Sequence, residues 1–136
     1  MATTTATITL NSTDLLTDEL SLSTTATLTQ AGNSTGLTGT SGLGRKTVTG
    51  GHAQYTLFDG NVYPSGPAKA HKVYLKNTST TASEFFLVTI NGEDLGHLYA
   101  GDWAFFPWHA HDGDNDIKID PSAADMTLEY MLFTDE

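Results

Sequence analysis

Four short strand-like segments follow one another between Val73 and Trp108, and this run constrains the fold more than any other feature of the sequence. Polar turn sequences (NTSTTAS, NGED and AGD) separate the segments. Such turns are rich in Asn, Asp, Ser and Gly because these residues bond their own backbone or tolerate unusual dihedral angles. Short apolar runs rich in aromatic and β-branched residues between such turns predict antiparallel strands.

Two of these segments, Phe85–Ile90 and Trp103–Trp108, are apolar on both faces. A strand of a small antiparallel sheet normally buries one face and exposes the other to water, which gives an alternating pattern. A chain of 136 residues has little material of its own for a second cover. We therefore expect something outside the domain to cover the second face of these strands.

Most of the remaining chain shows period-two alternation. Residues 4–10 alternate Thr with apolar positions, and residues 20–29 place Leu and Ala on one face and Ser and Thr on the other. Further strands are expected at 45–49, 53–58, 117–120 and 126–133. These segments predict one all-β domain over residues 1–136, an antiparallel β-sandwich of about eight to ten short strands with a jelly-roll-like arrangement.

The stretch Gln30–Gly44, QAGNSTGLTGTSGLG, is the one low-complexity segment. A loop of this length is uncommon inside a compact domain and is usually functional or disordered. We expect a Gly/Ser/Thr-rich loop within the sandwich, with Leu37 and Leu43 as the side chains able to attach it to the core.

The composition excludes several classes of function. A net charge of −10 argues against nucleic-acid binding, which depends on Lys and Arg at phosphates. The absence of cysteine removes disulfides, thiolate catalysis and cysteine zinc sites. No segment reaches the ~20 apolar residues of a membrane-spanning helix, and the first ten residues lack the features of a signal peptide. We expect no membrane association and synthesis in the cytoplasm without secretion by a signal peptide.

Two patterns suggest metal binding. His109 and His111 stand at i and i+2, so on a strand both would point to one side and could hold one metal ion. The pattern is similar to the first motif of cupin metalloenzymes, but no Glu follows at a short distance and no His follows His111. The acidic run Asp112–Asp116 has alternate carboxylates, as calcium loops do, without the glycine and glutamate positions of an EF-hand. We favour a strand end with solvated or interfacial histidines for the first pattern and a solvated turn for the second, and expect no catalytic residue, no metal site and no cofactor.

An aromatic cluster between Tyr99 and Trp108 predicts a contact surface, because Trp and Tyr anchor protein interfaces and can also stack on sugar rings. The N-terminal strand could also add to the sheet edge of a neighbouring subunit. The side chains expected at an interface are Ile8, Leu10, Phe86, Val88, Trp103, Phe106 and Trp108.

The segment VYLKNTSTTASEFFLVTI, followed by LGHLYAGDWAFFPW, resembles small β-sandwich structural proteins of tailed-bacteriophage virions. The shared pattern is a strand ending in YLKN, a polar turn, an apolar strand and then a glycine and a proline that Gly101 and Pro107 match. The Thr-rich opening TATITLNSTDLLTDELSLSTTATLTQAG is similar to structural proteins of marine cyanophage-type phages.

This resemblance implies a non-enzymatic virion protein, in the first place a capsid decoration (cement) protein that stabilises the phage head. It implies a homotrimer or larger oligomer in contact with the major capsid protein or another virion protein. One alternative is a phage tail component or a receptor- or carbohydrate-binding module. A further alternative is a cupin-like metalloenzyme that uses His109 and His111.

Overall fold

The computed structural model describes residues 3–15, 17–63, 69–111 and 115–135, and within these ranges the chain forms strands and turns. None of the described residues belongs to a helix long and apolar enough to cross a membrane. The strands, in chain order, are β1 (Thr4–Ser12), β2 (Leu20–Leu28), β3 (Gly39–Thr40), β4 (Gly44–Val48), β5 (Tyr55–Phe58), β6 (His71–Asn77), β7 (Phe85–Ile90), β8 (Glu93–Tyr99), β9 (Trp103–Trp108), β10 (Ile117–Pro121) and β11 (Met126–Thr134).

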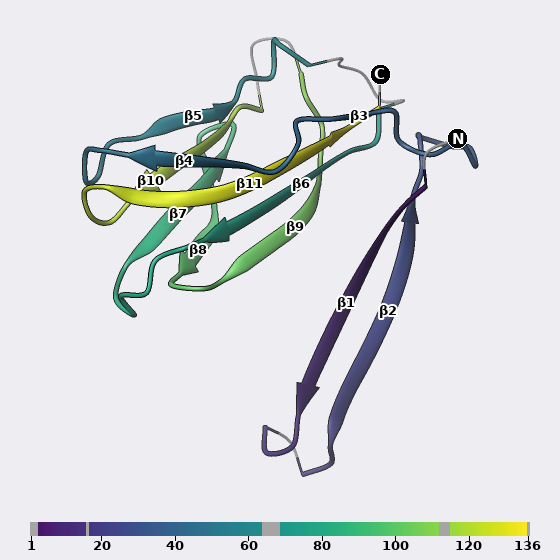
Figure 1. Cartoon of the computed structure of the whole chain (residues 1–136), viewed down its shortest axis with the longest axis horizontal. Coiled ribbons are helices and arrows are strands. Elements are labelled where there is room, and N and C mark those ends of the chain that lie inside the picture. Colours follow the sequence, from purple (N-terminus) through teal and green to yellow (C-terminus); the bar gives the residue numbers. More distant parts are fainter. Residues whose placement is uncertain (1–2, 16, 64–68, 112–114, 136) are drawn as a thin grey trace.

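Strands β3 to β11 form two antiparallel sheets that pack face to face (Figure 1). One has the order β5–β10–β7–β8. The other has the order β3–β11–β6–β9, with β4 also paired to β11. The predicted all-β antiparallel β-sandwich is confirmed. Most consecutive strands cross from one sheet to the other, which is compatible with the expected jelly-roll wrapping.

The core fills the space between the two sheets. Strand β6 alternates strictly, with Val73 and Leu75 fully buried and the residues between them only half-buried. Each such apolar side chain contributes about 1.5–3 kcal/mol when fully buried. The apolar core residues with 0% exposure are Val73, Leu75, Phe86, Ala110, Ile117, Ile119, Leu128 and Leu132.

Strand β9 places alternate residues on opposite sides of its sheet. Ala104, Phe106 and Trp108 point into the sandwich, and the Trp108 indole N–H donates to the carbonyl oxygen of Asn115 at 2.8 Å. Trp103, Phe105 and Pro107 point outward and are exposed. The pairing with β6 sets this choice, because Phe106 lies opposite the buried Val73 and Phe105 lies opposite Tyr74.

Four of the predicted interface residues are corrected by this arrangement. Phe86, Val88 and Trp108 are 0–3% exposed, and Phe106 packs against the same core. Phe86, Val88 and Trp108 fill the sandwich itself and offer no surface to a partner, and the half-buried Phe106 points to the same inner side. A charge at any of them would disrupt the fold rather than an interface.

The second face of β7 is partly covered from within the chain. The Phe85 ring lies 4.4 Å from the His97 ring and 5.3 Å from the Tyr99 ring, centroid to centroid, on the neighbouring strand β8. Phe85 is therefore half-buried although it lies outside the core, and Leu87 on the same face of β7 is half-buried as well.

Strands β1 and β2 form a separate two-stranded sheet that projects from the sandwich (Figure 1). We call this hairpin, residues 4–28, the N-terminal arm. Its strands pair along their whole length, from Thr4 opposite Leu28 to Ser12 opposite Leu20. On one face hydroxyl groups bond across the strands, as in the Thr7–Thr25 pair at 2.7 Å. Within the described residues, the chain thus forms a sandwich and an arm that does not join either of its sheets.

The base of the arm is attached firmly to the sandwich. Leu28 and Leu37 are 4% and 5% exposed, and the Leu37 N–H donates to the Leu28 carbonyl at 3.4 Å. The Ala31 N–H donates to the Asp135 carboxylate at 3.1 Å. Leu37 thus attaches the Gly/Ser/Thr-rich segment to the body, as expected, whereas Leu43 is 64% exposed. The segment also contains the short strand β3.

Candidate functional site: an apolar cleft between arm and sandwich

The outer face of the sheet that contains β6 and β9 carries exposed aromatic side chains. Trp103 is 49% exposed and Phe105 is 36% exposed. Tyr74 lies between Phe105 and Met131 in the cross-strand register. We call Tyr74, Trp103, Phe105 and Met131 the aromatic sheet face. Side chains on one face of adjacent strands are close neighbours, so these four form one apolar patch.

The arm has an apolar face of its own. Register pairs Ala6 with Ala26 and Leu10 with Leu22, so the apolar residues of both strands share one side of the hairpin. Leu10 and Leu22 are 45% and 46% exposed. No second layer covers them within the described residues, since β1 and β2 form a sheet of two strands.

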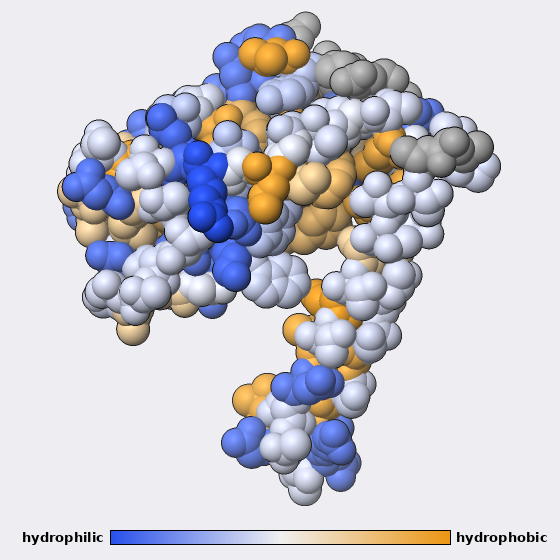
Figure 2. All heavy atoms as spheres, viewed as in Figure 1, coloured by the Kyte–Doolittle hydropathy of each residue, from blue (hydrophilic) through white to orange (hydrophobic). Residues whose placement is uncertain are grey.

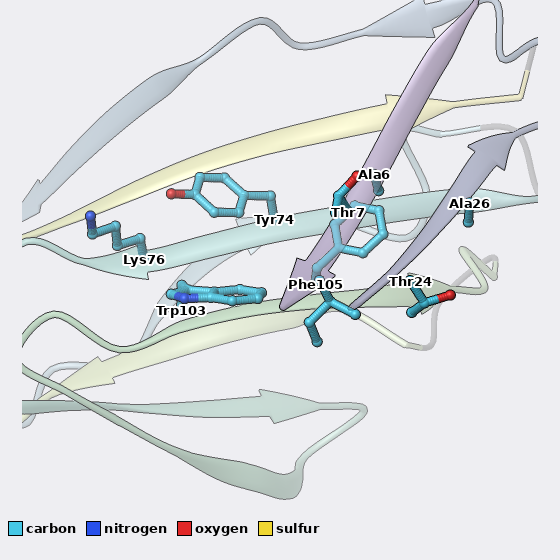
Figure 3. Close-up of a pocket in the computed structure, with 9 residues that line it drawn as sticks. Ala6, Thr7, Thr24, Ala26, Tyr74, Lys76, Trp103 and Phe105 are labelled. Atoms are coloured by element: carbon cyan, nitrogen blue, oxygen red, sulfur yellow. The ribbon is translucent and has the colours of Figure 1, made fainter. Parts of the chain in front are cut away.

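The two apolar faces line opposite walls of one open cleft of about 480 Å³. Figure 2 shows the hollow between arm and sandwich, with hydrophobic side chains on the arm beside it. Figure 3 shows that the lining side chains come from the arm on one side and from β6 and β9 on the other. The cleft is lined by Ala6, Thr7, Ile8, Thr24, Ala26, Tyr74, Lys76, Trp103 and Phe105.

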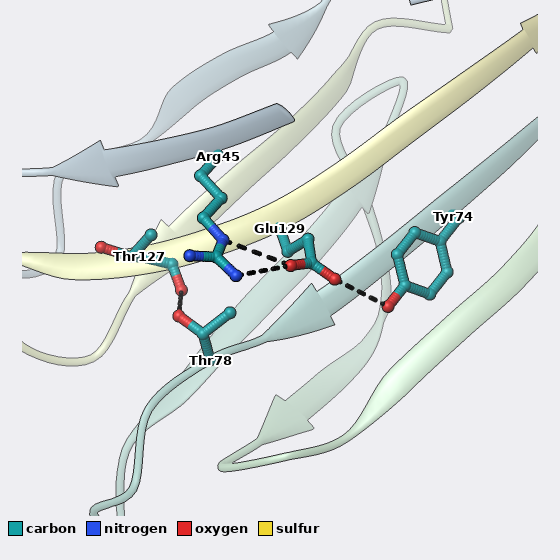
Figure 4. A network of polar contacts seen from close by, with 5 residues as sticks. All are labelled: Arg45, Tyr74, Thr78, Thr127 and Glu129. Atoms are coloured by element: carbon teal, nitrogen blue, oxygen red, sulfur yellow. Dashed lines mark hydrogen bonds and ion pairs between the residues drawn. The ribbon is translucent and has the colours of Figure 1, made fainter. Parts of the chain in front are cut away.

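A polar network borders the aromatic sheet face (Figure 4). The Arg45 guanidinium contacts Glu129 Oε2 at 3.1 and 3.2 Å, and the Tyr74 hydroxyl donates to Glu129 Oε1 at 3.1 Å. Burial, followed by this bond to the carboxylate, raises the pKa of Tyr74 above its usual value. The network fixes the Tyr74 ring at the edge of the apolar patch.

Beside this network lies a second, polar hollow, which includes Arg45, Lys76, Ser79 and Glu129 in its lining. The Arg45 side chain is 69% exposed, so its remaining N–H donors are accessible there although its charge is paired with Glu129. Arg45 and Lys76, together with Lys72, are three of the six basic residues of the chain. All three lie on the outer face of this one sheet.

The arm carries the opposite charge. Asp14, Asp18 and Glu19 lie at its tip, between β1 and β2, and all three are exposed. The first 44 residues contain no Lys or Arg. The tip is therefore acidic, whereas the border of the aromatic sheet face is basic.

Of the predicted interface residues, the structure brings Ile8 and Trp103 into the same cleft, and Leu10 lies farther along the same face of the arm. Sequence reasoning did not select Tyr74, Phe105 or Leu22. Because successive side chains on a strand point to opposite faces, Phe105 shares a face with Trp103, whereas Phe106 lies on the opposite face. This alternation was the sequence signal that could have identified Phe105.

The histidine pair lies at the end of β9, away from the cleft. His109 and His111 are both exposed, with ring centroids 5.9 Å apart. Within the described ranges no group of three or more His, Cys, Asp or Glu side chains could hold a metal ion. Of the acidic run, residues 112–114 lie outside the described residues, and Asp116 accepts a hydrogen bond from the Gly60 N–H at 2.8 Å.

No family model, no curated protein and no solved structure matches this chain.

Proposed function

We propose that this protein is a non-enzymatic structural protein that acts by assembling into a homo-oligomer. The observation that carries the proposal is the pair of uncovered apolar faces, one on the arm and one on the sandwich, on the two walls of the cleft. Contiguous exposed apolar surface of this kind marks interaction sites on soluble proteins. Large exposed aromatic residues are also the side chains that anchor protein interfaces.

The chemistry of the cleft supports assembly over catalysis. Of the nine residues that line it, Lys76 alone is charged at neutral pH. The others are Ala, Ile, Thr and aromatic side chains, without the paired acid, base or nucleophile that an active site needs. The surface is suited to contact with another apolar surface.

The place of assembly that we propose is a tailed-phage virion, with decoration of the capsid as the first role. This part rests on the resemblance of Val73–Trp108 and of the Thr-rich opening to virion structural proteins. A β-sandwich with a projecting arm also suits a subunit that contacts its neighbours and the major capsid protein at once. By hypothesis, the added contact area resists expansion of the shell.

The first test is the molar mass of the purified protein by light scattering, over a range of concentrations and with and without chelator. A trimer or larger oligomer that is indifferent to chelator supports the proposal. A monomer at every concentration overturns self-assembly as the function. A mass that depends on chelator would instead favour a metal-linked assembly through the Asp112–Asp116 segment or the histidine pair.

The virion location has its own test, which is quantitative mass spectrometry of purified particles of the parent phage. A decoration protein should be present in a simple ratio to the major capsid protein. A tail component would be present in far fewer copies. Absence of the protein from the particles would refute the virion role, but it would leave the proposal of self-assembly unaffected.

A second candidate function is carbohydrate or receptor binding, favoured by one observation. Trp103, Phe105 and Tyr74 are outward-facing aromatic side chains on a rigid sheet, and aromatic rings of this kind also stack on sugars. A glycan array with and without calcium tests it. Specific binding that Trp103→Ala abolishes would support this function over self-assembly.

A further inference from the structure

We propose that the aromatic sheet face is covered by the N-terminal arm of a second copy of this chain. In this contact the apolar side of the partner's arm packs on Tyr74, Trp103 and Phe105. The acidic tip of that arm lies beside Arg45 and Lys76. This inference rests on the proposed function and names its partner and its interface.

The arm requires a cover that its own hairpin does not supply. A two-stranded hairpin is at best marginally stable alone in water and needs a further layer against its apolar side. Each strand has nine residues, which at ~3.3 Å per residue gives an arm of about 30 Å. Strand β6, with seven residues, is shorter, so one arm spans the whole aromatic sheet face and extends beyond it.

The chain's own arm does not cover this face. It forms the opposite wall of the cleft, and about 480 Å³ of open space separates it from the sheet. Its base is held by the buried Leu28 and Leu37, and by the bond from the Ala31 N–H to Asp135. Folding the arm down onto its own sheet would break these contacts, whereas an arm from another copy meets no such restraint.

Charge complementarity favours an arm over an unrelated apolar segment. The tip carries Asp14, Asp18 and Glu19 and no cation, in a chain of net charge −10. A surface able to receive three carboxylates must be basic, and half of the chain's Lys and Arg residues lie on the outer face of this sheet. The polar hollow at Arg45 and Lys76 is where the tip of an arm running along β6 and past Trp103 would arrive.

The contact is compatible with two symmetries. Reciprocal exchange of arms between two copies makes a closed dimer, whereas passing each arm to the next copy makes a ring such as a trimer. Both use the same residues. The oligomer number therefore does not alter the test.

Charge reversal tests the contact in the full-length chain. The tip variant Asp18→Lys/Glu19→Lys and the sheet variant Lys76→Glu should each weaken self-association about 10- to 100-fold by light scattering, because each puts like charges together. Combining all three substitutions in one chain restores opposite charges and should recover the association. The matched controls lie on the other sheet: Glu93→Lys/Asp94→Lys for the tip variant, and Lys118→Glu for the sheet variant. They should associate like the unaltered protein.

Each outcome is decisive. Undiminished association of either variant overturns the proposed contact, as does failure of the combined variant to recover. An equal loss in the controls overturns it too, because that result would show a general charge effect. In all these cases the proposed function stands as long as the unaltered protein is an oligomer. If the unaltered protein is a monomer, the proposed function itself is refuted.

Cross-linking gives a second measurement that does not depend on charge. The chain contains no cysteine, so introduced thiols report one contact. Tagged Ile8→Cys mixed with untagged Phe105→Cys and oxidised should give a mixed disulfide dimer on a non-reducing gel. Thr9→Cys, on the hydroxyl side of the same strand, should not. Equal cross-linking of both arm variants, or of neither, overturns the orientation proposed for the arm.

Discussion

Replacing Trp103 by Thr tests the aromatic sheet face most directly, because this indole is half exposed and lies within the proposed contact. Trp103 is 49% exposed. An aromatic side chain of its size can bury about 250 Å², so about 120 Å² remains for a partner to cover. At ~25 cal/mol per Å² this area is worth up to about 3 kcal/mol for each contact. The substitution should therefore weaken self-association by up to about 100-fold.

Sedimentation velocity over a dilution series measures this change. The matched control is Tyr99→Thr, which removes an aromatic side chain of similar exposure, 44%, from the outer face of the opposite sheet. Threonine keeps the preference for strand structure in both variants, so the two monomers should lose similar, small amounts of stability. Association constants that agree between Trp103→Thr and the unaltered protein would refute the reasoning. An equal loss in Tyr99→Thr would refute it as well.

Three further predictions concern the sandwich. Asn77→Ala should lower the free energy of unfolding by about 3 kcal/mol, because the buried amide donates to Leu98 O at 2.9 Å and Glu84 O at 3.3 Å and accepts from the Ser79 N–H. Gly44→Ala should cost about 1–3 kcal/mol, since a Cβ there would lie 2.7 Å from the Tyr130 ring. The raised pKa of Tyr74 predicts stability that is complete below its usual value of 10.0 and is lost as pH rises through the folded-state pKa.

Each of these predictions has a control and a measurement. Urea unfolding compares Asn77→Ala with Asn11→Ala, whose side chain is exposed on the arm; equal midpoints would contradict the role of the buried amide. Gly96→Ala has open space around the new Cβ and should be nearly neutral, so a loss as large as that of Gly44→Ala would contradict the steric argument. Tyr74→Phe should remove one late-ionising tyrosine from an absorbance titration, and an unchanged titration curve would contradict the raised pKa.

Local pattern in the sequence determined the class of fold. Alternation and turn residues predicted strands at 85–90 and 103–108, where β7 and β9 lie. The NGED turn predicted the reversal between β7 and β8, where Asn91 and Gly92 adopt positive φ values of 52° and 77°. Such features depend on neighbouring residues alone, so they can be read without tertiary information.

Tertiary structure decided which apolar side chains are core and which are surface. Both faces of Trp103–Trp108 are apolar, so alternation separates Trp103 from Phe106 without saying which one is buried. The register of β9 on β6 makes that choice by placing Phe106 opposite Val73. Ile8 and Leu10 show the same alternation as a sandwich strand, yet they lie on the projecting arm. Burial depends on where strands that are distant in sequence pack, and a period-two pattern does not determine that packing.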